Sequence, residues 1–289
     1  MLSYVFKNNK NEKKKILINY ANDKYKAAQH LQSKTGRKAG FDQVIEYGSD
    51  DIDPIFKDEH ADIFSYERGD GLWLWKPYLI LKTLDICEDG DIVFYCDSGA
   101  LFFRNARPVF DILKNQDIWI SVLPLIEKQF TKSETFKVMN AQGSEYSETP
   151  QISGTFAAFK KTEFTFAFVK EWLDYCCDIK AIAPPECKWG DSDEAEYFFA
   201  HREDQSILSL LSKKHHIRAY SDPSQYGRLP EKYIRDNCRM EYYGKEDYRP
   251  FILHHRTGDG NSSVLFKQWL CAVLPRTIGL KFIGREHLT

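Results

Sequence analysis

The chain has 289 residues, of which 43% are hydrophobic and 15% aromatic, and its formal net charge is −2. This length and composition allow one large α/β domain with a sizeable core. The balanced charge excludes the strongly basic surface that general nucleic-acid binding requires. The seven cysteines form no Cys-x-x-Cys pair and their number is odd, so at least one thiol stays unpaired. We therefore expect a reducing compartment rather than a secreted, disulfide-stabilised protein.

The first third of the chain alternates strand and helix signals after a polar leader. Residues 1–15 are rich in lysine, and no apolar run is long enough for a signal peptide or a membrane span. We therefore predict a cytoplasmic protein. The pattern predicts, in chain order, a strand at 16–20, a helix at 24–33, a strand at 43–47, a short helix beginning within 49–54, a helix at 77–87 and a strand at 92–96.

The rest of the chain continues the alternation and ends in a short tail. It predicts a strand at 118–123, a helix at 131–139, a polar loop at 140–150, a strand at 154–160, a helix from Thr162 to Cys177, an irregular segment at 181–193, a helix at 203–213 and a strand at 250–255. Strands alternating with helices predict a mostly parallel, twisted sheet flanked by helices. A boundary near 258–263 divides a domain of residues 1–260 from a helical tail, 261–289.

Two charged residues stand at positions where α/β folds hold phosphorylated ligands. Asp97 follows the apolar strand 92–96, so its carboxylate is expected at the carboxyl edge of the sheet. The alternative is that Asp97 only caps the turn at Ser98 and Gly99. Lys76 stands at a helix start, where its charge opposes the helix dipole, so a bound anion would account for it. Simple solvation of Lys76 at the surface is the alternative.

Two later segments add polar residues that chemistry could use. Asp204 and Gln205 open the helix at 203–213, where acidic residues are also favourable without any function. His255 follows the last predicted strand and precedes Arg256 and Gly258. A lone histidine is usually structural. Here, however, it lies in the last of three segments that follow one another along the chain: an acidic strand end, an Asp-Gln helix start and a His-bearing strand.

These segments carry a resemblance to a known family. Tyr95-Cys-Asp-Ser-Gly99 resembles a degenerate Asp-x-Asp signature, and Asp204-Gln205 with Leu208 resembles the Asp-Gln-x-x-Leu segment of family-8 retaining glycosyltransferases. His255-x-x-Gly258, with Lys267 downstream, is similar to the C-terminal His-x-x-Gly motif of that family. With Trp73-Leu-Trp-Lys-Pro77, the chain resembles bacterial capsular and lipopolysaccharide sugar transferases of the GT-A fold.

The resemblance implies a single GT-A-like domain and a role for each matched residue. The activity would be transfer of a sugar from a nucleoside-diphosphate sugar to a glycan or lipid-linked acceptor in surface polysaccharide synthesis, with retention. Asp97 and His255 would bind Mn²⁺ or Mg²⁺ at one pyrophosphate pocket. Tyr20 and Asn22 would contact the nucleotide; Lys76, Gly99, Arg256 and Gly258 would surround the diphosphate; Asp204 and Gln205 would lie beside the anomeric carbon.

Several alternatives stay open at this point. Gly99 stands where the family has a second metal-binding Asp, so a noncatalytic nucleotide-sugar or carbohydrate-binding protein is the second hypothesis. Lys76 and Arg256 are candidates to replace part of the metal's role. Asp191, Asp193 or Glu194 could serve as the base of an inverting enzyme. A nucleotidyltransferase is less favoured, because no glycine-rich loop follows the first strand. Residues 264–289 either pack on the domain or contact an anionic membrane from the cytoplasmic side.

Overall fold

The computed structural model describes residues 13–185, 198–233, 241, 246–259 and 261–279. The candidate bases Asp191, Asp193 and Glu194 and the end of the tail, 280–289, lie outside these ranges. Within the described ranges, no helix combines the length and the apolar character that crossing a bilayer would need.

The centre of the molecule is a mixed sheet of six strands in the order β2-β1-β3-β6-β5-β7. The three pairings β1–β2, β1–β3 and β5–β7 are parallel, and β6 is antiparallel to both of its neighbours, β3 and β5. The two short strands β4 and β8 form a separate antiparallel pair. The strands are β1 Lys15–Tyr20, β2 Gln43–Tyr47, β3 Ile92–Cys96, β4 Ala100–Phe102, β5 Ile118–Ile126, β6 Pro150–Lys160, β7 Ala219–Tyr220 and β8 Ile252–His254.

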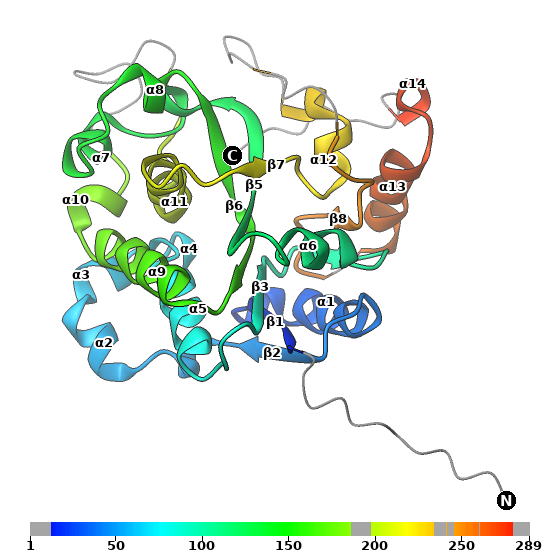
Figure 1. Ribbon diagram of the computed structural model, residues 1–289, viewed down its shortest axis with the longest axis horizontal. Helices are drawn as coiled ribbons and strands as arrows, with labels where there is room; N and C mark the ends of the chain where they lie inside the picture. The colour runs from blue at the N-terminus through cyan, green and yellow to red at the C-terminus, as the bar shows by residue number, and fades with distance from the viewer. Residues whose placement is uncertain (1–12, 186–197, 234–240, 242–245, 260, 280–289) are drawn as a thin grey trace, which may run out of the picture.

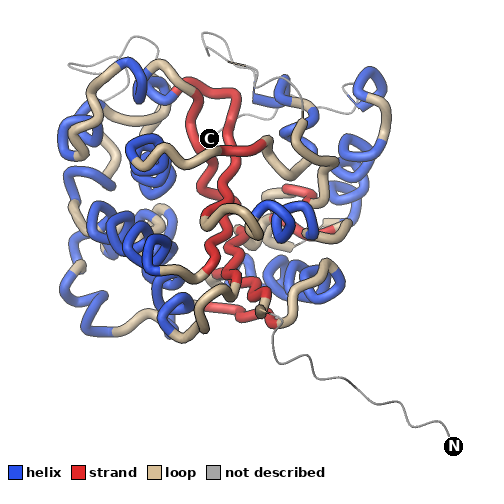
Figure 2. The backbone as a smooth tube through the Cα atoms, in the orientation of Figure 1, coloured by secondary structure: helices blue, strands red, loops and turns tan. Residues whose placement is uncertain are grey.

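Helices cover both faces of this sheet. In Figure 1, α5, α9 and α11 lie on one side of the strands and α1 and α6 on the other, and Figure 2 shows the strands as a column between them. The α-helices are α1 Lys26–Lys38, α2 Pro54–Glu59, α3 Ala61–Phe64, α4 Gly69–Leu72, α5 Trp75–Asp85, α6 Arg107–Ile112, α7 Ser133–Val138, α8 Ser144–Ser147, α9 Glu163–Cys176, α10 Ile179–Ile182, α11 Glu203–Lys214, α12 Gln225–Arg228, α13 Ser262–Val273 and α14 Arg276–Gly279.

The central strand β3 shows why a continuous apolar run makes a strand here. Side chains alternate between the two faces of a strand, and both faces of this sheet are covered. Val93 and Tyr95 join the larger core on the side of α5 and α9, whereas Phe94 and Cys96 join the second core on the side of α1 and α6. Tyr20, at the end of β1, falls in the same core as Tyr95, so the two rings approach the same edge of the sheet.

The predicted α/β fold with a mostly parallel sheet is confirmed, and several boundaries are corrected. Thr162 caps α9 as predicted, because its side chain accepts a hydrogen bond from the Thr165 amide. The predicted loop 140–150 contains helix α8, and the predicted irregular segment begins within α10. The last strand, predicted at 250–255, is only β8. It pairs with β4 outside the main sheet, and the tail helix α13 packs on this pair through Leu101, Leu253 and Ala272.

Candidate functional site

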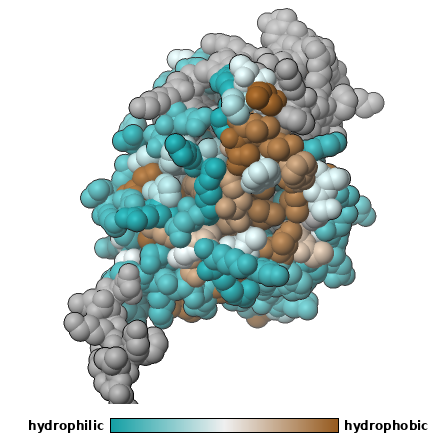
Figure 3. Space-filling model, turned by 90° about the vertical axis from the view of Figure 1, so that its right-hand side faces the viewer, coloured by the Kyte–Doolittle hydropathy of each residue, from teal (hydrophilic) through white to brown (hydrophobic). Residues whose placement is uncertain are grey.

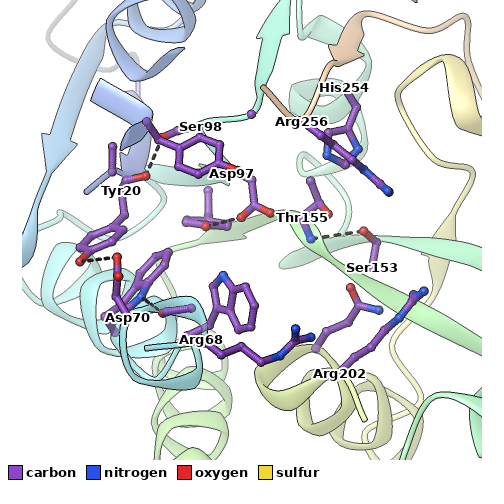
Figure 4. A pocket seen from close by; sticks show the side chains of 18 of the residues that line it. Tyr20, Arg68, Asp70, Asp97, Ser98, Ser153, Thr155, Arg202, His254 and Arg256 are labelled. Carbon is purple, nitrogen blue, oxygen red and sulfur yellow. Dashed lines mark hydrogen bonds between the residues drawn. The ribbon is translucent and has the colours of Figure 1, made fainter. Parts of the chain in front are cut away.

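A cavity of about 660 Å³ opens where segments far apart in the sequence meet. Figure 4 shows Asp97 pointing into it, with Tyr20 and Asp70 on one side and Arg202 and Arg256 on the other. This volume is in the range of small-molecule sites. Its lining takes residues from the end of β1, the segment before α5, the end of β3, the start of α11 and the end of β8. Of the predicted site residues it includes Tyr20, Asn22, Asp97, Gly99, Gln205 and Arg256.

An aromatic and amide group forms one wall of the pocket. The ring of Tyr20 stacks on Trp75 with centroids 3.9 Å apart and an interplanar angle of 21°. The Tyr20 hydroxyl donates to Asp70 Oδ2 at 3.4 Å, and Asn22 Nδ2 donates to Asp70 Oδ1 at 3.3 Å. Burial, and then the Asp70 charge, raise the pKa of Tyr20, so its hydroxyl stays protonated. Among the described groups, the buried Asn22 Oδ1 has no hydrogen-bond donor, so this wall offers an acceptor to a ligand.

Asp70 reaches this wall through an unusual left-handed turn. Residues 69–73 all have positive φ, from 52° at Asp70 to 91° at Gly71. Gly69 and Gly71 tolerate this conformation, but Leu72 and Trp73 are strained in it. Trp75 Nε1 donates to the Gly69 carbonyl oxygen at 2.8 Å, which closes the turn. Strained backbone of this kind is characteristic of functional sites, and the turn aims both Asp70 and Trp73 at the pocket.

Asp97 belongs to a cluster of three charged side chains that we call the buried triad: Lys76, Asp97 and Asp204. Lys76 Nζ lies 2.7 Å from Asp204 Oδ2 and 3.9 Å from Asp97 Oδ1, and it donates to the Gly154 carbonyl oxygen at 3.1 Å. The side chains of Lys76 and Asp204 are 3% and 4% exposed, whereas that of Asp97 is 33% exposed. Lys76 and Asp204 are therefore not among the lining residues, and only Asp97 presents its carboxylate to the cavity.

Burial governs the ionisation of the triad. It raises the pKa of Asp204 to about 7, although the Lys76 ammonium opposes the rise. Burial also raises the pKa of Asp97, against Lys76 and the Tyr95 hydroxyl, which donates to Asp97 Oδ1. For Lys76, burial lowers the pKa, but the two carboxylates outweigh it and the pKa rises overall. The triad thus holds Lys76 as an ammonium, and Lys76 is a structural counter-charge rather than a surface cation.

Gln205 takes a fixed position at the pocket edge. Its Oε1 accepts from the Gly154 amide at 3.0 Å, and its Nε2 donates to Gln151 Oε1 at 2.8 Å. Gly154 has no side chain, which allows this approach: a Cβ there would lie 2.9 Å from Gln205 Cβ. Gln205 is therefore a preorganised polar group, held between β6 and α11.

The segment after β8 corrects one prediction. His254 and Arg256 line the pocket, and His255 between them does not. His255 Nδ1 accepts from the Thr257 amide at 3.2 Å, so the imidazole proton sits on Nε2. Burial lowers the pKa of His255 to about 4. Gly258 also lies outside the lining, because it packs against α1: its carbonyl oxygen accepts from the Ala28 amide at 3.1 Å.

The residues present do not fit the predicted divalent metal. Within the part of the chain that the structure describes, no group of three or more His, Cys, Asp or Glu side chains could hold a metal ion. Asp97 is one carboxylate, Gly99 supplies none, and His255 lies outside the pocket lining. The pairing of Asp97 with His255 around Mn²⁺ or Mg²⁺ is therefore not assembled here.

Three arginines, which we call the arginine rim, line the pocket: Arg68, Arg202 and Arg256. Arg68 Nε lies 2.6 Å from Glu203 Oε1, and its guanidinium stands over the Trp73 ring at 5.4 Å. Sequence reasoning missed Asp70, His254 and Arg202 as lining residues. His254 had a readable signal in its place beside the predicted His255, and Asp70 had a weaker one in its flanking glycines.

Comparison with known proteins finds solved structures of similar fold, but their TM-scores and sequence identities to this chain are low. No family model matches the chain, and no curated protein matches its sequence. Mouse xyloside xylosyltransferase 1 is 11% identical, with a TM-score of 0.43 over 88% of this chain and 99% of that chain. Glycosyltransferase GlyE of Streptococcus pneumoniae TIGR4 is 11% identical, with a TM-score of 0.45 over 93% and 63%. Galactosyltransferase LgtC, with donor and acceptor sugar analogues, is 15% identical, with a TM-score of 0.40 over 74% and 78%. At these scores the likenesses carry no argument about this chain's chemistry.

Proposed function

We propose that this chain is a glycosyltransferase that moves a sugar from a nucleoside-diphosphate sugar to a glycan or lipid-linked acceptor. The observation that carries the proposal is the convergence of separately predicted residues on one cavity. Tyr20, Asn22, Asp97, Gly99, Gln205 and Arg256 come from four segments of the chain and line the same pocket. The pocket lies at the carboxyl ends of the parallel strands β1 and β3, where α/β folds bind nucleotides.

Each part of the pocket suits one part of such a donor. The wall of Tyr20, Asn22 and Asp70 offers a stacked ring and hydrogen-bonding groups for the nucleoside. Asp97 places a carboxylate near the centre of the cavity, where it opposes the positive charge that grows on the sugar ring in an oxocarbenium-like transition state. Gln205 stands on the α11 side with its amide fixed. The arginine rim supplies positive charge for the leaving diphosphate.

The central test replaces Asp97. We expect Asp97→Asn to cut turnover by about 10²-fold or more, because it removes the preorganised charge from the reaction centre. Asp111→Asn is the matched control: Asp111 is an exposed carboxylate on α6, paired with Arg107 and Lys114. Turnover would be measured as donor hydrolysis and sugar transfer, after a thermal-shift screen of nucleotide sugars has identified the donor. Near-normal turnover of Asp97→Asn would contradict the site.

We assign a retaining outcome to the reaction, because Asp204-Gln205 resembles the Asp-Gln segment of the retaining family and Gln205 lines the pocket. The measurement is the anomeric configuration of the product by NMR. An inverted product would remove Gln205 from this role and turn attention to Asp191, Asp193 and Glu194 as bases, which lie outside the described residues.

The second candidate is a noncatalytic nucleotide-sugar-binding protein, which Gly99 favours because it removes one functional carboxylate from the site. Calorimetry with nucleotide sugars, combined with a hydrolysis assay, separates the two. Binding without turnover on any acceptor would support this alternative.

We further propose that the protein acts in surface-polysaccharide synthesis on the cytoplasmic side of the membrane, and that residues 264–289 contact this membrane. Figure 3 looks at the side of α13 and α14 and shows a gathering of hydrophobic residues. The exposed hydrophobic side chains of these helices are Phe266, Trp269 and Ile278, and Phe266 stacks on Trp269 with centroids 6.1 Å apart. Replacing Phe266 and Trp269 by serine should reduce co-sedimentation with anionic liposomes. Unchanged co-sedimentation, or none by the unaltered chain, would contradict this contact.

A further inference from the structure

Backbone groups and cationic side chains, rather than further carboxylates, surround Asp97. A Cβ at Gly99 would lie 3.2 Å from Arg256 Cα and 3.5 Å from Arg256 N. The Gly99 carbonyl oxygen accepts from the amides of both His255 and Arg256, at 2.9 and 2.8 Å. The chain after β8 therefore crosses directly over residue 99, and a side chain there would press on the Arg256 backbone, which would have to shift by a few tenths of an ångström. Gly99 thus suits this close crossing, and it supplies no carboxylate.

Asp97 itself is already compensated. Its Oδ1 accepts from the Tyr95 hydroxyl and lies 3.9 Å from the buried Lys76 ammonium. A divalent ion bound to Asp97 would face this ammonium at close range, although Asp204, at 2.7 Å from Lys76 Nζ, offsets part of the ammonium charge. Lys76 thus already supplies part of the positive charge that a metal ion would bring to the Asp97 carboxylate.

The segment after β8 that crosses over Gly99 also brings the guanidinium of Arg256 to the pocket. Arg256 has φ of 58°, a strained value for a residue with a side chain, and its guanidinium stands over the Tyr226 ring at 5.0 Å. Arg256 and Arg202 lie on the same side of the cavity, across from Tyr20 and Asp70 (Figure 4). Arginine is suited to a diphosphate because its planar fork donates two parallel hydrogen bonds to phosphate oxygens.

We propose, on the basis of the proposed function, that Arg256 holds the donor's diphosphate and that the site binds it without a divalent ion. Lys76 partly compensates the charge of Asp97, and Asp97 acts on the sugar rather than through a metal. In the transfer step, the bond between the anomeric carbon and the diphosphate oxygen breaks. Its electron pair stays on the diphosphate beside Arg256. The acceptor hydroxyl oxygen forms the new bond to the anomeric carbon, and its proton passes to the departing diphosphate oxygen.

The test is binding of nucleoside diphosphates, with inorganic pyrophosphate as a minimal probe, by calorimetry on the full chain. A panel of uridine, guanosine, cytidine and adenosine diphosphates is titrated in EDTA and then in Mn²⁺ or Mg²⁺. We expect the Kd of the best ligand to agree within about threefold between the two buffers. Arg256→Gln should weaken binding at least about tenfold, as loss of a charge-assisted hydrogen bond does. Arg107→Gln, which removes an exposed guanidinium on α6, is the matched control.

Asp97→Asn separates the two modes of binding. If a metal on Asp97 held the diphosphate, this variant would lose affinity. In the proposed mode, affinity is unchanged or rises, while turnover falls. Should Arg256→Gln fail to fold, Arg256→Lys is the second variant. It keeps the charge but loses the planar fork, so its Kd is expected to lie between that of the original chain and a tenfold weaker value. Binding that requires the divalent ion overturns this inference and leaves the glycosyltransferase intact. Binding of no member of the panel in either buffer overturns both.

Discussion

The buried triad and the arginine rim hold the same kinds of charge in two different settings. In the triad, Lys76 and Asp204 are 3% and 4% exposed and form an ion pair of 2.7 Å. At the rim, Arg68 forms a similarly short pair of 2.6 Å with Glu203, but here only one member is buried: the Glu203 side chain is 4% exposed and that of Arg68 is 51% exposed. A buried charge that loses its partner has no water to replace it, whereas an exposed one does. The two pairs should therefore differ in energy although their distances are alike.

The largest effect is expected from breaking the triad. Lys76→Met removes the ammonium between Asp97 and Asp204 and should lower the free energy of unfolding by about 3–5 kcal/mol, because the buried Asp204 carboxylate loses its ion-pair partner. Urea denaturation followed by circular dichroism measures it. Lys82→Met, at an exposed site on the same helix whose ammonium donates only to the Asp51 carbonyl oxygen, is the control.

A second variant tests the cause of that loss. Lys76→Met combined with Asp204→Leu removes both members of the pair and should recover a substantial part of the stability. If the double variant is less stable than Lys76→Met alone, uncompensated charge is not the reason for the loss.

The sequence was informative about strands and poor at pairings between distant segments. It located β1, β2 and β3 to within a residue. The apolar runs of β1 and β3 are buried on both faces, whereas β2 is a partly exposed edge strand. It placed Asp97 at the edge of the sheet because this residue follows the apolar run of β3. It could not pair Lys76 with Asp204, since no local pattern records that α5 and α11 meet. It also misplaced His255, because the extended strand stops at His254 and Arg256 turns to positive φ without a glycine or asparagine to mark the change.

The buried, neutral His201 extends the comparison of buried and exposed groups to the dependence of stability on pH. His201 Nε2 lies 3.0 Å from the Ala181 carbonyl oxygen, and burial, with Lys132 nearby, lowers its pKa from 6.5 to about 3. In the unfolded chain the imidazole takes up a proton as the pH falls below about 6.5, and in the folded chain it does not until about pH 3. This residue therefore destabilises the fold as the pH falls, by about 1.4 kcal/mol per pH unit below 6.5.

The His201 effect is isolated by comparing two pH profiles. His201→Gln keeps a donor and an acceptor but does not titrate. The difference in unfolding free energy between the original chain and His201→Gln should be constant above pH 7 and should shift against the original chain below pH 6. The raised pKa of Asp204 acts oppositely, since its stabilising effect is lost as the pH rises from 3.8 toward 7, but it is common to both chains and cancels. Parallel profiles down to pH 4.5 would show that His201 is not held neutral.

The smallest effect is expected at the rim. Arg68→Gln breaks the pair with Glu203 and removes the guanidinium from over Trp73. Because water reaches the Arg68 side chain but Glu203 is left buried without its partner, the loss of unfolding free energy should be about 1–3 kcal/mol, below that of Lys76→Met. Glu203 is itself buried and has positive φ, so some loss is expected and zero is not. Raising the salt concentration from 0.05 to about 1 M should shrink the Arg68→Gln effect and leave the Lys76→Met effect nearly unchanged, because salt screens exposed pairs far more than buried ones. An Arg68→Gln loss as large as that of Lys76→Met, and equally insensitive to salt, would mean that exposure does not set the energies of these two pairs.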